Sequence, residues 1–259
     1  MTVPANKAIE LRRPDASNLD SPFEERVLRL YVAVTNKCNR ACPFCSVYAS
    51  TTGKTFIKLE QIVAHVPKRG PYQVQLEGGE PFLHPAIFTF TRHFSEDPRC
   101  TKIIISTNGS KFPFVVDERG IDPEASWPGL LQFFSRLPKN SVLKISLNHY
   151  LLENDPHLFS KAKLILDTAQ EQAINVVFNL RKRNASQHEC DAYLETLVDK
   201  HGLRPFTNSF YLQRYGRNAN DENAEAPYLV GTNWCAVNPD GKAWGIDLIG
   251  RSDAMRRLP

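Results

Sequence analysis

Six short runs of apolar, largely β-branched residues recur along the chain, and each predicts a β-strand. They lie at residues 29–34, 72–77, 102–107, 142–147, 174–180 and 208–213. Between most of these runs the apolar residues fall at helical spacing, as in 56–66 and 158–169. Strands that alternate with helices pair in parallel, because each return to the same edge of a sheet needs a crossover connection. The pattern therefore predicts an α/β fold with a parallel sheet.

One further helix is delimited by signals at its two ends. Ser186 and Glu189 match a capping box, and the helix is expected to run to about His201, with Gly202 as its stop signal. Six strand–helix units are too few for a closed eight-unit barrel. An open partial barrel and a doubly wound sheet are both compatible with this count.

Polar residues alternate with apolar ones in several predicted strands, although a parallel sheet covered on both faces reads as almost wholly apolar. The polar positions share one parity and gather towards the carboxyl ends of the strands: Gln73, Gln75, Glu77, Ser106, Asn108, Ser146, Asn148, Asn179, Arg181, Tyr211 and Gln213. α/β folds bind ligands at those ends. We therefore expect a polar lumen that holds a ligand, whereas simple solvent exposure would explain any single strand.

The composition is that of an ordinary folded domain, with 42% hydrophobic and 23% charged residues in a chain of 259. Residues 1–27 are polar and punctuated by prolines, and we expect a loose N-terminal arm. No apolar run approaches the roughly 20 residues of a membrane span, and the start of the chain lacks the apolar core of a signal peptide. These features predict a cytoplasmic protein without membrane association.

The charge balance does not favour a nucleic-acid partner. Lysine and arginine total 32 against 28 aspartates and glutamates, and they are dispersed apart from residues 181–183. Proteins that bind nucleic acids gather such charge into a patch or stripe.

Three of the six cysteines, Cys38, Cys42 and Cys45, lie within eight residues directly after the first predicted strand. In a reducing compartment, clustered cysteines hold a metal or do redox chemistry more often than they form disulfides. Structural zinc sites take four protein ligands, often as two separated pairs, and no second such pair follows downstream. Three thiolates suit a four-iron cluster that leaves one iron open, while a buried or zinc-binding trio is the alternative.

The CxxxCxxC spacing, with Phe44 just before the last cysteine, resembles the signature of the radical S-adenosylmethionine (radical SAM) superfamily. Two further segments resemble that family: 78–81 (GGEP) and 106–109 (STNG), at the ends of the second and third strands. The resemblance implies a partial (β/α)6 TIM-like barrel over residues 28–217. The arm 1–27 would precede it, and a C-terminal extension, 218–259, would cover the barrel mouth.

The resemblance also implies two cofactors, one [4Fe-4S] cluster on Cys38, Cys42 and Cys45, and S-adenosylmethionine on its open iron. Backbone groups of Gly78 and Gly79 would approach the methionine ammonium, and Glu80 would supply negative charge or brace the turn. The other implied cofactor contacts are hydrogen bonds from Ser106, Asn108 and Ser146 to carboxylate and ribose, Asn179 or Arg181 at the carboxylate or adenine edge, and Phe44 near adenine.

The tail points to the branch of the family. Residues 233–244 predict a β-hairpin with its turn at Asp240 and Gly241, which resembles part of a degenerate SPASM/twitch-type extension. Such extensions carry several cysteines, whereas Cys235 stands alone here, so we expect a single cluster. Cys235 itself has two interpretations: a small buried hydrophobe, or a catalytic thiol that returns a hydrogen atom to a substrate radical.

The resemblance implies reductive cleavage of S-adenosylmethionine to a 5′-deoxyadenosyl radical, which abstracts hydrogen from a small polar biosynthetic substrate. We expect a redox-neutral outcome: rearrangement, epimerisation or bond formation. Flavodoxin or ferredoxin would supply the electron. Two alternatives remain, a modifier of ribosomally made peptides, and a non-catalytic iron–sulfur or zinc-binding protein.

Overall fold

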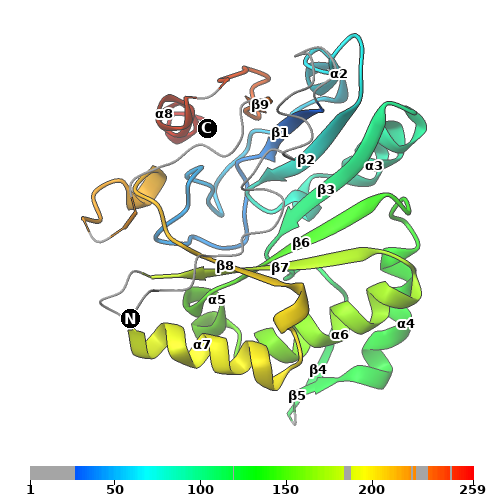
Figure 1. Ribbon diagram of the computed structural model, residues 1–259, viewed down its shortest axis with the longest axis vertical. Helices are drawn as coiled ribbons and strands as arrows, with labels where there is room; N and C mark the ends of the chain where they lie inside the picture. The colour runs from blue at the N-terminus through cyan, green and yellow to red at the C-terminus, as the bar shows by residue number, and fades with distance from the viewer. Residues whose placement is uncertain (1–26, 119, 184–187, 223, 226–232, 246) are drawn as a thin grey trace.

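A parallel sheet of seven strands forms the centre of the molecule. The computed structural model describes residues 27–118, 120–183, 188–222, 224–225, 233–245 and 247–259. The strands are β1 (Leu28–Thr35), β2 (Tyr72–Gly78), β3 (Cys100–Thr107), β6 (Ser141–Leu147), β7 (Asn175–Lys182), β8 (Thr207–Tyr211) and β9 (Trp234–Val237). Their order is β8-β7-β6-β3-β2-β1-β9, and each neighbouring pair is parallel (Figure 1). The predicted α/β fold, an open partial barrel, is confirmed.

Most of the helices cover the outer side of this sheet, whereas the last one lies beside the loop that holds Cys38 (Figure 1). The α-helices are α2 (Leu59–Val63), α3 (Ile87–Glu96), α4 (Pro123–Phe134), α5 (His149–Asn154), α6 (Leu158–Glu171), α7 (His188–Lys200) and α8 (Leu248–Arg256). Short 3-10 turns form η2 (Pro81–Leu83), η4 (Arg204–Phe206) and η5 (Gly216–Asn218). Among the described residues, no helix combines the length and the hydropathy that a bilayer crossing requires.

The predicted helix boundaries can be compared at α7. This helix ends at Lys200, and Gly202 follows with φ +67°, the left-handed conformation expected of a stop signal. Ser186, half of the predicted capping box, lies outside the described residues. A small antiparallel pair, β4 (Val115–Asp117) with β5 (Gly120–Asp122), was not predicted.

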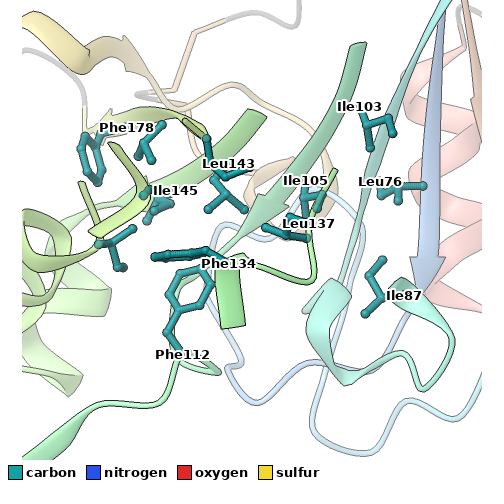
Figure 2. Packing of buried hydrophobic residues seen from close by; sticks show 14 of the residues in the cluster. Leu76, Ile87, Ile103, Ile105, Phe112, Phe134, Leu137, Leu143, Ile145 and Phe178 are labelled. Carbon is teal, nitrogen blue, oxygen red and sulfur yellow. The ribbon is translucent and has the colours of Figure 1, made fainter. Parts of the chain in front are cut away.

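The hydrophobic core lies between the outer face of the sheet and the helices. Leu76, Ile105 and Phe178 from the strands and Phe134 of α4 are all fully buried there in one cluster (Figure 2). Burying one such side chain stabilises the fold by about 1.5–3 kcal/mol. The residues of opposite parity, including the predicted polar set, face the other side of the sheet. The core thus leaves the inner face free for polar chemistry.

Residues beyond 233 return to the edge of the sheet beside β1. Trp234 pairs with Arg29 and Cys235 with Leu30, so β9 is a seventh parallel strand. The turn predicted at Asp240 and Gly241 is present, with Gly241 at φ +84°. A single antiparallel bridge joins Val237 and Ala243 across it. The first arm of the expected hairpin therefore belongs to the main sheet as well.

Candidate active site

A cavity of about 150 Å³ opens at the carboxyl ends of the strands, between the cysteine loop and the inner face of the sheet. We call it the lumen pocket. Most of the residues singled out from the sequence line it: Cys38, Cys42, Phe44, Cys45, Gly78, Gly79, Ser106, Asn108, Ser146, Asn179 and Arg181. Glu80 and Cys235 are not among its lining residues. The structure therefore brings the three family-like segments together at one end of the sheet.

The cysteine loop begins where β1 ends, and its three thiols are free. Burial raises the pKa of Cys38 to about 12 and that of Cys42 to about 11, and the nearby thiols add repulsion in the same direction. In the described part of the chain, no three His, Cys, Asp or Glu side chains converge on one metal-ion position. A four-iron cluster offers each thiolate a separate iron, so it does not require such convergence.

Residues 216–217 fasten this loop from outside. The Arg217 guanidinium donates to the carbonyl oxygens of Cys42 (3.0 Å), Tyr48 (3.1 Å) and Ala49 (2.8 Å), and its backbone N–H donates to Cys45 O (3.0 Å). Gly216 has φ +67°, and a Cβ there would lie 2.5 Å from Cys45 O. Sequence reasoning noted this segment only as the end of the barrel, because its contacts lie about 170 residues earlier.

The turn after β2 crosses the start of the cysteine loop at contact distance. Gly78 has φ +124°, and a Cβ on Gly79 would collide with Lys37 O. The Gly79 N–H donates to Thr35 O (2.8 Å), and the Glu80 N–H donates to Lys37 O (2.9 Å). Glycine is required here because the two backbones lie too close for a side chain.

Glu80 is completely buried behind this turn. Its carboxylate accepts hydrogen bonds from Thr107 Oγ1 (2.7 Å), Asn108 N (2.9 Å) and Phe82 N (3.2 Å). Burial raises the pKa of Glu80, while these hydrogen bonds oppose the shift. Of the two roles expected for Glu80, the contacts correspond to bracing, because the carboxylate ties the ends of β2 and β3 together.

Asn108 lies between β3 and the cysteine loop. Its side-chain N–H2 group donates to Asn39 Oδ1 (3.0 Å) and lies 3.7 Å from Cys38 Sγ. A hydrogen bond to a cysteine sulfur is one of the means by which a protein tunes an iron–sulfur cluster.

Several polar atoms of the lumen pocket are buried without a partner among the described residues. They are Arg40 Nε, Ser106 Oγ and Arg181 Nε. Leaving such an atom unsatisfied costs about 1–3 kcal/mol, so these groups fit a ligand rich in acceptors. Phe44 adds an aromatic wall, with the rings of Tyr150 and His149 centred 6.3 and 6.4 Å away. The carboxylate, ribose and adenine of S-adenosylmethionine match this combination of donors and ring surface.

A chain of polar side chains crosses the floor of the lumen pocket. Lys144 Nζ donates to Gln75 Oε1 (3.3 Å), and Gln75 Nε2 donates to Glu77 Oε2 (2.8 Å). Arg251 of α8 donates to Glu77 Oε1 (3.1 Å). The alternation pattern placed Gln75 and Glu77 in the lumen but missed Lys144, although Lys144 has the same parity as Ser146.

Cys235 lies on the other side of the sheet. It is in register with Leu30 and packs, half-buried, against the hydrophobic core. Burial raises the pKa of its thiol. This placement does not support the catalytic interpretation of Cys235, because the core-facing side of β9 points away from the lumen pocket. It corresponds instead to the small buried hydrophobe.

Comparison with known proteins agrees with this site. The sequence profile of the Radical SAM superfamily matches residues 32–184, which is more than half of the chain. A GTP 3′,8-cyclase of Chlorobaculum tepidum is 28% identical over 110 residues, covering 40% of this chain and 33% of that protein. A GTP 3′,8-cyclase of Cronobacter sakazakii is 32% identical over 101 residues, covering 36% and 31%. The chain thus spans about a third of the length of the curated relatives it matches.

Proposed function

The chain belongs to the radical SAM superfamily, and on that premise we propose that it abstracts hydrogen from a small polar biosynthetic substrate. Members of this family bind a [4Fe-4S] cluster and S-adenosylmethionine. When bound, these groups supply one-electron cleavage of the sulfonium and a 5′-deoxyadenosyl radical. The observation that carries the proposal is the lumen pocket, where three free thiols meet buried donors that lack a partner in the described part of the chain.

The chain's own residues would hold and orient these cofactors. Cys38, Cys42 and Cys45 would bind the cluster. Arg217 holds the loop that carries them by donating hydrogen bonds to backbone carbonyl groups of the loop. The cofactor would be received by Phe44, Gly78, Gly79, Ser106, Asn108, Ser146, Asn179 and Arg181, which line the same pocket. Glu80 acts as a positioning residue, because it fixes the backbone of two of these segments.

A redox-neutral outcome is part of the proposal. Beyond residue 217 the sequence contains one cysteine, Cys235, which faces the hydrophobic core. That tail therefore offers no set of thiolates for an auxiliary cluster, which would otherwise accept an electron from the substrate radical. Rearrangement, epimerisation or bond formation is consistent with this ligand set. An external donor, flavodoxin or ferredoxin, would supply the electron.

A cytoplasmic location belongs to the same proposal. The cysteines that the structure describes are all free thiols. Free thiols persist in reducing compartments and become disulfides in oxidising ones.

The test is anaerobic reconstitution with iron and sulfide, followed by dithionite and S-adenosylmethionine, with 5′-deoxyadenosine measured by chromatography. We expect formation in the parent protein and none in Cys42→Ala. Cys100→Ala is the matched control, since Cys100 lies at the opposite end of β3 and should retain full formation. A protein that holds iron, binds the cofactor and yet never cleaves it would favour the non-catalytic alternative.

A further inference from the structure

Lys144 stands in the lumen pocket with most of its hydrogen-bonding capacity unused. It lies on β6 in register with Ser106 of β3, and its side chain lines the pocket. An ammonium group has three donors. Among the described residues one acceptor meets it, Gln75 Oε1 at the long distance of 3.3 Å. None of the segments that resemble the family's motifs includes this lysine.

The charges around Lys144 are unbalanced. Arg40, Lys144 and Arg181 line the lumen pocket, and Glu77 is the one carboxylate among its described lining residues. Arg251 already binds Glu77, at 3.1 Å and with little solvent exposure. Neither Lys144 nor Arg181 therefore has a carboxylate of its own within the pocket wall. Two cationic groups with spare donors, one of them an unpartnered Arg181 Nε, face the same space.

We propose that Lys144 anchors an oxyanion of the substrate, a carboxylate or a phosphate, and that Gln75 and Glu77 hold its ammonium in place for that contact. The proposal rests on the proposed function, because it takes the lumen pocket as the place where substrate meets the cofactor. An oxyanion of the substrate would satisfy the spare donors of Lys144 and neutralise its charge together. Charge-assisted hydrogen bonds of this kind are about twice as strong as neutral ones.

The same geometry makes anion binding depend on pH. Loss of solvation is the largest effect on Lys144 and lowers its pKa to about 7, with Arg29 of β1 and Arg181 of β7 acting in the same direction. Glu77 of β2 acts against them. A bound anion favours the ammonium form, so binding takes up a proton above pH 7. Affinity should therefore be full below pH 7 and fall about tenfold for each unit above it.

The experiment measures anion binding by calorimetry on the reconstituted protein with S-adenosylmethionine present. The probes are sulfate, as a tetrahedral oxyanion in place of a phosphate group, and acetate, as a carboxylate. Neither probe titrates between pH 6 and 8, so any proton uptake comes from the protein. Titrations in two buffers of different ionisation enthalpy at pH 7.5 measure that uptake.

The variants are Lys144→Met, Lys144→Gln and the matched control Lys163→Met. Lys163 sits on α6, half exposed and paired with Asp167, away from the pocket. We expect the parent and Lys163→Met to bind sulfate or acetate with proton uptake. Lys144→Met should bind that anion at least about tenfold more weakly and without proton uptake. Preference for sulfate would assign the substrate a phosphate, and preference for acetate a carboxylate.

Two readouts keep this inference separate from structural damage and from the proposed function. A poorly solvated ammonium with one hydrogen bond does not stabilise a fold, so the unfolding midpoint of Lys144→Met should equal or exceed that of the parent. Equal anion binding in parent and Lys144→Met, or no binding of either probe to the parent, would overturn the inference. Formation of 5′-deoxyadenosine by the parent is measured in the same preparation, and its failure would count against the proposed function alone.

Discussion

Glu80 shows how a single buried carboxylate can shape the lumen pocket without lining it. Three donors near the ends of β2 and β3 converge on its carboxylate, so protein groups occupy its acceptor oxygens. The two neighbouring glycines bring the same turn against Lys37 O and Thr35 O. The positions of Cys38 and Asn108 therefore depend on a residue that does not itself line the lumen pocket.

Glu80→Gln should lower the free energy of unfolding by about 1–3 kcal/mol. The side-chain amide nitrogen of the glutamine would replace one carboxylate oxygen and face a protein donor that this oxygen accepts from in the parent. Urea unfolding of the parent and the variant measures this difference. Glu60→Gln is the control, since Glu60 lies exposed in the first turn of α2. Equal losses in the two variants would contradict the bracing role.

Asp97 should stabilise the fold at neutral pH and not in acid. Its carboxylate accepts from the Arg99 side chain and from Tyr72 Oη (3.0 Å), and these contacts lower its pKa to about 2. A pKa below the unfolded value contributes stability above about pH 4, which is lost as the pH falls towards 2.

Asp97→Asn should therefore lower the free energy of unfolding by about 1–2 kcal/mol at pH 7. The difference from the parent should shrink between pH 4 and pH 3, as urea titrations at each pH would show. A difference independent of pH would mean that packing, and not charge, carries the effect.

At the scale of elements, the cysteine loop is set by what packs over it as much as by its own sequence. The segment at η5 reaches it through Arg217 and through the close approach of Gly216. Ser252 of α8 donates to Ser46 O, and Asn36 donates to Pro259 O at 2.9 Å. Elements from three parts of the chain thus meet at one loop.

Gly216→Ala should reduce the iron bound after reconstitution by more than half, because its Cβ would push Cys45 and Ser46 out of place. Gly202→Ala is a matched control. Gly202 has the same φ of +67°, but a Cβ there meets nothing within 4 Å. Both variants share the backbone strain of about 1 kcal/mol, so iron loss confined to Gly216→Ala isolates the contact with the loop. Equal iron contents would contradict it.

The elements differ in how far the sequence predicts them. Strands such as 102–107 are predictable because β-branched runs between turn signals carry their own signal. The strand β9 is four residues long, and it exists through pairing with a strand about 200 positions earlier. The pair β4 and β5 is shorter still, and its Val115 and Val116 are exposed. The local pattern predicted the β9 segment only as a hairpin arm, because its place in the main sheet depends on that distant strand, and β4 and β5 are too short to give a pattern of their own.

The site residues also differ in how far the sequence predicts them. The three cysteines and the segment 78–80 are short contiguous motifs, so the resemblance to the family identifies them from the sequence. Lys144 was missed because a lysine within a strand normally faces solvent, and only the register beside Ser106 shows that it faces the lumen. Cys235 was misplaced for the related reason that the partner strand of β9, and hence its facing, depends on the tertiary fold.

At the scale of the whole molecule, the C-terminal segment couples the inner pocket to the outer surface of the cysteine loop. Arg251 of α8 reaches Glu77 on the pocket floor and Asn238 after β9. Met255 of the same helix packs against Cys38 and Val47. The helix α8 therefore contacts both the floor of the lumen pocket and the cysteine loop.

Removing residues 248–259 should loosen the cysteine loop while the far half of the sheet stays intact. Hydrogen exchange should accelerate at residues 46–55, and the cluster's visible absorbance should bleach faster in air. Amides of β7, which lies towards the opposite edge of the sheet from β9, serve as the internal reference. Unchanged exchange at 46–55 would show that the loop holds its shape without α8.

The position of these contacts along the chain also orders events during biosynthesis. A ribosome that has completed Cys45 still has to add about 200 residues before Ser252 emerges, roughly 10–40 s at about 5–20 residues per second. Until then the loop lacks the residues that close over it. Iron and sulfide delivered to the closed loop would therefore meet a barrel whose strands have all been synthesised.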